Sequence, residues 1–158
     1  MTKPTTYTVR KATETDAESL IQFNTAMALE TENMKLDRNK IEPGVMGLFA
    51  NPQYGFYMVA EHEDTVVGSL MVTTEWSDWR NGIFWWIQSV YVIPEYRRKG
   101  VYRSMYQTIT EMAKSGQFHK VCGFRLYVEK ENRIAQKTYR DLGMSETHYK
   151  MFEDISKK

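Results

Sequence analysis

Apolar residues near the start of the chain recur with the period of a helix that follows a short strand. The alternation over Tyr7–Lys11 is typical of a strand, and Ala17–Leu29 places its apolar residues on one helical face. Thr13 lies three positions before Asp16, which is the spacing of a capping box that would start this helix. The polar segment Glu30–Asp37 predicts a loop after the helix.

The middle of the chain changes to a pattern of strands. A second helix is expected over Arg38–Phe49, although Pro43 weakens its pattern. Three apolar runs rich in β-branched and aromatic residues then predict strands: Phe56–Glu61, Val66–Thr74 and Ile83–Ile93. The stretch Glu75–Gly82 predicts a long turn between the last two strands, and Pro94 closes the last one.

The last third of the chain alternates helices with strands. Apolar residues at helical spacing predict a helix from Gly100 to Gly116, and a buried strand is expected over Val121–Val128. Asn132–Leu142 predicts a short helix, and Glu146–Phe152 predicts a final strand. Strands that first pair through short turns and later alternate with helices indicate an α/β fold, with a mixed sheet and helices on both faces.

Composition and charge narrow the classes of function. We expect residues 1–158 to form a single domain, because 158 residues suit one domain of ordinary size. The 21 basic and 20 acidic residues leave a net charge of +1, which argues against a nucleic-acid partner. No apolar run is long enough to cross a bilayer, so we expect no membrane partner. The single cysteine, Cys122, allows no disulfide within the chain and favours the reducing cytoplasm.

The most informative segment joins the strand that ends at Ile93 to the helix that begins at Gly100. Basic residues lie before and just inside this helix: Arg97, Arg98, Lys99 and Arg103. A helix N-terminus offers backbone N–H groups and the positive end of the helix dipole. Gly100 would let the backbone approach a ligand closely. Together these features suit a diphosphate, although a solvated basic turn would show the same pattern.

This segment resembles the acyl-CoA signature of the GNAT acyltransferase superfamily, Arg/Gln-x-x-Gly-x-Gly/Ala. Arg97, Gly100 and the strand before them match, while Tyr102 stands where the family usually has Gly or Ala. The resemblance implies acetyl-CoA as the cofactor, with its pyrophosphate on the loop amides and its pantetheine arm along the strand. It assigns cofactor binding to residues at the end of the strand and in the loop and helix start that follow: Val90, Tyr91, Val92, Arg97, Arg98, Lys99, Gly100, Val101, Tyr102 and Arg103.

A second segment, a strand followed by a helix with Asn132 and Tyr139 at the family's spacing, resembles the same superfamily. The resemblance implies a mostly antiparallel sheet in which Ile83–Ile93 and Val121–Val128 run parallel and splay apart to admit the pantetheine. It also implies that Tyr139 is the general acid for the leaving thiolate. Tyr139 could instead be a core aromatic. Asn132 could cap the helix, bind the pantetheine or do both.

The acceptor amine must lose its ammonium proton before it attacks, and no single residue stands out as the base. Several residues are candidates for the acceptor side, and for the acidic ones a solvated surface is the alternative: Glu30, Glu32, Glu75, Trp76, Asp78 and Gln88. Among these, Glu75 is a candidate base, and Gln88 could orient water or the acceptor by hydrogen bonds. Trp76 could form part of an aromatic wall for a cation, or it could equally be a core or dimer contact. No His or Cys has metal-ligand spacing, so no metal is expected.

The stretch around Gln88 also loosely resembles diamine acetyltransferases, which carry acidic residues where this chain has Gln88 and Ser89; this argues against a polyamine. We therefore predict an N-acetyltransferase that moves the acetyl group of acetyl-CoA directly to a primary amine of a small molecule in a ternary complex. A non-catalytic acyl-CoA-binding or sensing module and a peptide or protein N-acetyltransferase remain alternatives. The aromatic residues between Trp76 and Trp86 also favour a homodimer.

Overall fold

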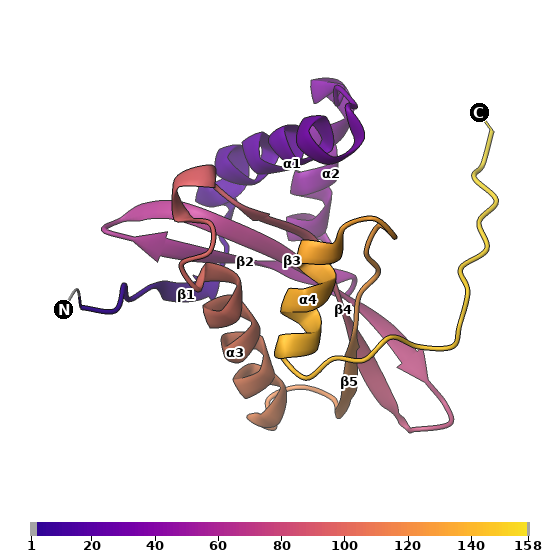
Figure 1. Ribbon diagram of the computed structural model, residues 1–158. Helices are drawn as coiled ribbons and strands as arrows, with labels where there is room; N and C mark the ends of the chain where they lie inside the picture. The colour runs from indigo at the N-terminus through magenta and orange to yellow at the C-terminus, as the bar shows by residue number, and fades with distance from the viewer. Residues whose placement is uncertain (1–2, 158) are drawn as a thin grey trace. The chain divides into compact units, whose positions relative to one another are not determined.

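A five-stranded sheet forms the centre of the first of two structural units. The computed structural model describes residues 3–157, and the contacts divide the chain into Met1–Tyr127 and Val128–Lys158. The strands lie side by side in chain order (Figure 1). Their bounds are as follows: β1 Thr8–Lys11, β2 Gly55–His62, β3 Thr65–Ser77, β4 Gly82–Val92 and β5 Val121–Arg125.

The sheet is mixed, as the sequence predicts. β1 to β4 pair antiparallel, whereas β4 and β5 pair parallel. The parallel register runs only from Ile83 opposite Val121 to Trp86 opposite Arg125, and β4 continues beyond it to Val92. β5 is therefore shorter than the predicted Val121–Val128, because a strand ends where its neighbour no longer takes its backbone hydrogen bonds. This divergence is the expected splay of the two strands.

A β-bulge bends β4 where it leaves β5. Ser69 lies opposite Tyr91 and Met71 opposite Gln88, so β4 has one residue more than β3 over this stretch. Ser89, inside the bulge, has a φ of 50°. Beyond the extra residue, the alternation of side chains between the two faces is shifted by one position. Tyr91 consequently lies on the same side of the sheet as Phe23, with ring centroids 5.2 Å apart.

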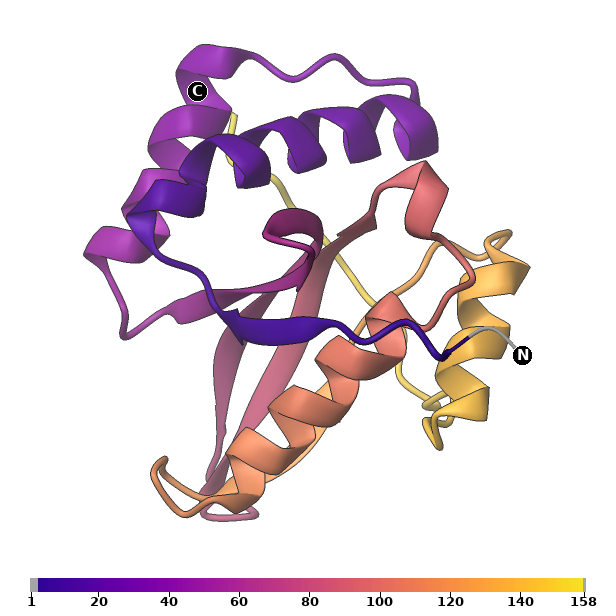
Figure 2. The ribbon, with the colours of Figure 1, turned by 90° about the vertical axis from the view of Figure 1, so that its left-hand side faces the viewer.

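Helices cover both faces of this sheet (Figures 1 and 2). α1 (Ala17–Glu32) and α2 (Arg38–Ala50) lie on one face, and α3 (Val101–Lys114) lies on the other. α3 buries Val101, Met105 and Ile109, which are four residues apart and so share one helical face. α2 continues through Pro43, its sixth residue, where proline removes one backbone N–H donor from the helix.

The capping box that the sequence predicts lies at the start of the short 3-10 helix η1 (Glu14–Asp16), which leads directly into α1. Thr13 and Asp16 exchange side-chain and backbone hydrogen bonds. Both carboxylate oxygens of Asp16 accept from Arg10 of β1, at 2.8 and 2.9 Å, and Arg10 also pairs with Glu61 of β2. Hydrogen bonds from the Arg10 guanidinium hold the pKa of Asp16 below its ordinary value. The buried carboxylate therefore ties α1 to the edge of the sheet.

Two predicted loops are wrong, and both corrections concern candidate site residues. Glu30 and Glu32 lie in the last turn of α1, which continues until Asn33 adopts a left-handed φ of 50°. Glu75 and Trp76 lie in β3, because the strand extends to Ser77 before the turn to β4. Aromatic residues favour strands, and cross-strand pairing with β4 overrides the polar pattern of this stretch.

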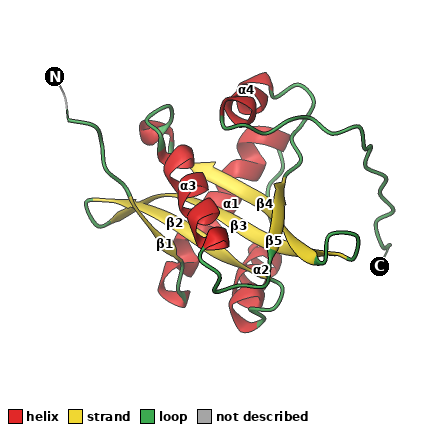
Figure 3. Cartoon of the chain, turned by 90° about the horizontal axis from the view of Figure 1, so that it is seen from below, coloured by secondary structure: helices red, strands yellow, loops and turns green. Residues whose placement is uncertain are grey.

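The second unit contains one helix and an extended tail. α4 (Arg133–Asp141) begins at Asn132, whose side chain accepts from the N–H of Ala135 at 3.1 Å. Asn132 therefore caps the helix, which was one of its two expected roles. The predicted strand Glu146–Phe152 is wrong, since residues 144–157 form no helix or strand (Figure 3). A strand needs a neighbour for its backbone groups, and no described strand pairs with this segment.

Candidate functional site

The loop between β4 and α3 has the backbone shape that an anion site needs. After the short 3-10 helix η2 (Pro94–Tyr96), the chain turns through Arg98 and Gly100, which have left-handed φ values of 62° and 84°. A side chain at Gly100 would meet no atom within 4 Å, so space outside the turn is open. The first backbone N–H of α3 to donate a helical hydrogen bond is that of Ser104, which donates to the Gly100 carbonyl. The amides before it lie at the exposed helix end, where an anion is favoured.

Three basic side chains surround this helix end. Arg98, Lys99 and Arg103 are exposed, and none takes part in an ion pair found among residues 3–157. The turn is held from the N-terminal side, because the Tyr7 hydroxyl donates to the Lys99 carbonyl at 3.1 Å. Charge and backbone shape thus combine in a way that suits a diphosphate.

Arg97, the first residue of the turn, points elsewhere. Its Nε donates to the Val92 carbonyl at 2.8 Å, and one Nη donates to Glu30 of α1 at 2.7 Å. Its guanidinium also lies 5.3 Å from the centre of the Tyr91 ring. The side chain of Arg97 is therefore engaged by hydrogen bonds within the protein, whereas the Nζ of Lys99 lies 5.5 Å from the centre of the Tyr96 ring.

The predicted cofactor residues Val101 and Tyr102 direct their side chains toward the core. Val101 is buried under α3, and Tyr102 packs against the same core cluster, with its ring 6.2 Å from that of Tyr106. Val101 and Tyr102 are the first two residues of α3, so their side chains pack on the core while their backbone forms the first turn of the helix. Tyr102, in the position where the family has Gly or Ala, is accommodated in this way.

One edge of β4 extends past its parallel neighbour. Beyond Trp86, the β4–β5 register stops, and Val90, Tyr91 and Val92 follow. Val90 and Val92 pack on the core under α3, while Tyr91 lies on the opposite face. An extended polar ligand can add to such an edge as a strand would, through backbone hydrogen bonds. This stretch leads directly into the basic turn.

On the α1 side of the sheet, Glu75 lies in a charged and aromatic cluster. Its Oε1 accepts from Arg125 of β5 at 2.7 Å and from the Trp86 indole at 3.2 Å. The Arg125 guanidinium lies 3.7 Å from the centre of the Phe84 ring, and that of Arg80 lies 5.1 Å from it. Glu75 therefore has a cationic partner and a fixed position.

Gln88 is the next residue on this face of β4. Its side-chain amide donates to the Thr73 hydroxyl at 2.6 Å. Alternation along the strand places Gln88 on the same face as Trp86, two residues earlier. The structure therefore brings Gln88 and Glu75 to one face of the sheet, each held by a neighbour from an adjacent strand.

Other predicted acceptor residues do not join this group. Trp76 follows Glu75 in β3 and so points to the opposite face, where its ring lies 5.1 Å from that of His119. Asp78 accepts from the Trp79 N–H at 2.8 Å in the exposed hairpin turn. Glu30 pairs with Tyr91 and Arg97, and Glu32 is exposed at the end of α1.

Tyr139, the predicted general acid, lies on α4 in the second unit. Burial raises the pKa of its hydroxyl above the ordinary value of 10.0. A phenol with a raised pKa keeps its proton at neutral pH, which is the form that a general acid needs.

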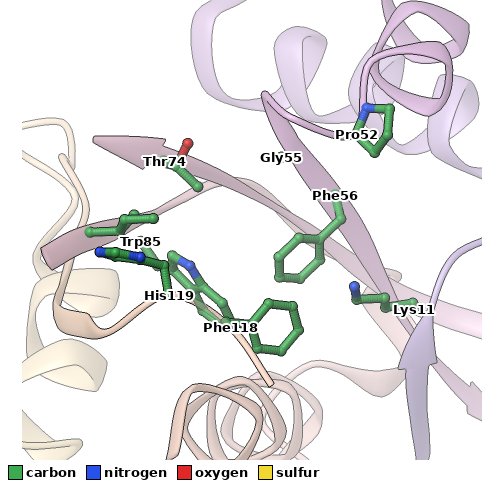
Figure 4. A pocket seen from close by; sticks show the side chains of 9 residues that line it. Lys11, Pro52, Gly55, Phe56, Thr74, Trp85, Phe118 and His119 are labelled. Carbon is green, nitrogen blue, oxygen red and sulfur yellow. The ribbon is translucent and has the colours of Figure 1, made fainter. Parts of the chain in front are cut away.

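A cavity of about 180 Å³ lies on the face of the sheet that α3 covers, away from the basic turn (Figure 4). Phe56, Trp85 and Phe118 form its aromatic walls, with Lys11 and His119 at the margin. None of the predicted site residues lines it. Within the described part of the chain, no cluster of His, Cys, Asp or Glu could hold a metal ion. No helix described there has both the length and the apolarity to cross a membrane.

Sequence analysis missed several residues that hold this site. Tyr7 and Thr73 carry no local signal, because only folding brings them to Lys99 and Gln88. Arg125 has a weak signal, since an arginine in an apolar strand needs a partner to offset its burial. Phe84 offered no signal beyond its place in an aromatic strand.

Comparison with known proteins agrees with this geometry. The sequence model of the acetyltransferase (GNAT) family matches residues 17–144. A possible acetyltransferase from Clostridium difficile 630 is 41% identical, covers 96% of this chain and 99% of its own, and superposes with a TM-score of 0.88. No curated protein gives a significant match.

Two more distant solved structures share the fold. One is a predicted acetyltransferase from Clostridium acetobutylicum with acetyl-CoA, at 17% identity, with coverage of 94% and 96% and a TM-score of 0.75. The other is glucosamine-6-phosphate N-acetyltransferase from Arabidopsis thaliana, at 19% identity, with coverage of 96% and 99% and a TM-score of 0.71. Because the family's sequence model spans most of the chain, this protein belongs to the GNAT family of acetyltransferases, and it is an acyltransferase that uses acetyl-CoA.

Proposed function

We propose that this chain transfers the acetyl group of acetyl-CoA to a primary amine of a small molecule, by direct attack in a ternary complex. One observation carries the proposal: the stretch of β4 that extends past β5 leads directly into a basic helix N-terminus with an open turn at Gly100. An extended thioester with a diphosphate at one end fits this sequence of features. We further propose that residues 1–158 act together as one domain, in the reducing cytoplasm that its lone Cys122 suits.

Different parts of the chain would hold different parts of acetyl-CoA. Backbone groups of Val90, Tyr91 and Val92 would bind the pantetheine as an added strand. The amides at the start of α3 and the side chains of Arg98, Lys99 and Arg103 would bind the diphosphate. Asn132 already caps α4, so a bond to the pantetheine would be its second role.

The reaction needs two proton transfers. The neutral amine nitrogen attacks the thioester carbonyl carbon, and collapse of the tetrahedral adduct breaks the C–S bond. Tyr139 would donate its phenolic proton to the departing sulfur and regain one from solvent. The proton lost by the amine would pass through water to the carboxylate of Glu75, with Gln88 orienting the acceptor or the water. The products are the N-acetyl amine and free CoA.

The charges on the acceptor side favour an acceptor that is not a polyamine. Glu75 is paired with Arg125, and Glu30 with Arg97, so two of the acidic candidates are already neutralised by guanidinium groups. Trp86 and Phe84 add apolar surface around Glu75. A singly charged amine on a partly apolar molecule suits such a site. The acceptor in the name of the Arabidopsis enzyme, glucosamine-6-phosphate, likewise carries a single amine and is not a polyamine.

Replacing Gly100 tests the diphosphate site. Gly100→Glu places a negative charge at the helix end, so CoA affinity should fall by about a hundredfold or more in isothermal titration calorimetry. Gly116→Glu is a matched control, because Gly116 lies just after the other end of α3, has a φ of 75° and also has open space around it. The control should lose similar backbone freedom but still bind CoA. Equal loss of affinity in both variants would contradict the assignment.

Replacing Tyr139 tests the general acid. Tyr139→Phe keeps the ring and removes only the proton donor, so turnover should fall by about a hundredfold or more when thiolate departure limits the rate, with CoA affinity little changed. Because burial raises the pKa of Tyr139 above its ordinary value of 10.0, ionisation of this group should not lower wild-type activity below that pH. Tyr149→Phe, in the exposed tail of the same unit, is the control. Unchanged turnover of Tyr139→Phe at every pH would make Tyr139 a packing residue.

A second copy of the chain is the partner that we propose. Trp76 and Trp79 in the β3–β4 hairpin are exposed, Trp79 to 89%, and a homodimer would cover such apolar surface. Analytical ultracentrifugation at micromolar concentration should give about twice the mass of the 18.6 kDa chain. Trp79→Ser should shift the mass toward the monomer, and a wild type that sediments as a monomer would overturn the proposal.

A further inference from the structure

The carboxylate of Glu30 connects α1 to the loop that precedes α3. Its Oε1 accepts from the Tyr91 hydroxyl at 3.1 Å, and its Oε2 accepts from Arg97 at 2.7 Å. These partners lie 61 and 67 residues further along the chain. Each carboxylate oxygen thus has a donor within the protein, and the negative charge of Glu30 is balanced by Arg97. This arrangement is a poor receptor for an acceptor ammonium.

Arg97 connects the same carboxylate to the end of β4. Its Nε donates to the Val92 carbonyl at 2.8 Å, so the backbone of the last β4 residue is tied to the first residue of the turn. The guanidinium of Arg97 packs against the Tyr91 ring, 5.3 Å from the ring centre. Phe23 of α1 packs on Tyr91 in turn. Burial and the bond to Glu30 raise the pKa of Tyr91, which therefore remains a donor.

The ends of this network are the parts of the chain to which the proposed function assigns CoA. Val92 is the last residue of β4. Arg97 is the first residue of the turn, in which Arg98 and Gly100 have left-handed φ values. Fixing the position of Arg97 fixes the direction in which the following amides point. An anion site built from backbone amides depends on that direction, because each N–H must aim at the ligand before it arrives.

We infer that Glu30 is a positioning residue for the CoA loop, which acts through Arg97, and that neither side chain binds substrate. This inference rests on the proposed function of the loop. It replaces two expectations drawn from the sequence, in which Glu30 contacts the acceptor and Arg97 contacts the diphosphate. The ion pair is partly exposed, with 42% and 40% of the two side chains accessible, so its contribution is moderate and comes mainly from geometry.

Glu30→Gln tests the inference, because it removes the charge and keeps the shape. CoA affinity measured by calorimetry should fall about threefold to tenfold, and the KM for acetyl-CoA should rise by a similar factor. The KM for the amine and kcat at saturation should stay unchanged, since the loop regains its shape once acetyl-CoA is bound. Glu18→Gln is the matched control: it breaks a glutamate–arginine pair at the other end of α1, with Arg38, and should leave CoA affinity unchanged.

A double-mutant cycle separates positioning from direct binding. If Arg97 acts together with Glu30, the variant with both Glu30→Gln and Arg97→Gln should bind CoA no more weakly than Arg97→Gln alone. Tyr91→Phe removes a single hydroxyl from the network, so it provides a milder second test and should also weaken CoA binding.

Several results would overturn the inference. A rise in the amine KM of Glu30→Gln with unchanged CoA affinity would make Glu30 an acceptor ligand. Losses of affinity that multiply in the double variant would make Arg97 a direct ligand of the diphosphate. If Glu30→Gln and Glu18→Gln lower CoA affinity equally, both effects would reflect general destabilisation of the protein. If the wild type binds no CoA, the proposed function itself fails, and the inference fails with it.

Discussion

The structure depends on the point at which β4 loses its parallel neighbour. Backbone N–H and C=O groups need partners, and a sheet normally supplies them on both sides of a central strand. Here β5 pairs with β4 only as far as Trp86 and Arg125, while β4 continues to Val92. A central strand is thereby converted into an edge within its own length. In the proposed function, the pantetheine arm of acetyl-CoA would pair with this edge in place of β5.

The other features of the first unit follow from this divergence. The bulge at Ser89 turns Tyr91 toward α1, where Glu30 meets it. The chain then passes through η2 and a turn with two left-handed residues before α3 begins. α3 packs its apolar face under the sheet, so its N-terminus and the basic residues around it are held at the end of the same edge. The strand edge and the helix end are thus joined by one short stretch of chain and packed on the same core.

Local patterns predicted much of this fold. Residues spaced by two or by four gave the strands and helices, and the glycine and basic residues before α3 indicated an anion site. The pairs of Arg97 with Glu30 and of Arg125 with Glu75 could not be predicted, because 67 and 50 residues separate the partners. The pair with Arg97 assigns Glu30 to the loop before α3, and the pair with Arg125 fixes the position of Glu75, the base of the proposed reaction. The expected strand over residues 146–152 failed for a related reason, since local propensity supplies no pairing partner.

We propose that this protein acetylates small-molecule amines. The most direct measurement incubates it with acetyl-CoA and two matched sets of acceptors, single primary amines of low mass and short peptides with free amino groups. Mass spectrometry of the products and thiol titration of released CoA are followed together. We expect an acetylated small amine, formed in equal amount to free CoA. Acetylation of peptides alone would contradict the acceptor class, and tight CoA binding without any acetylated product would favour a sensing module.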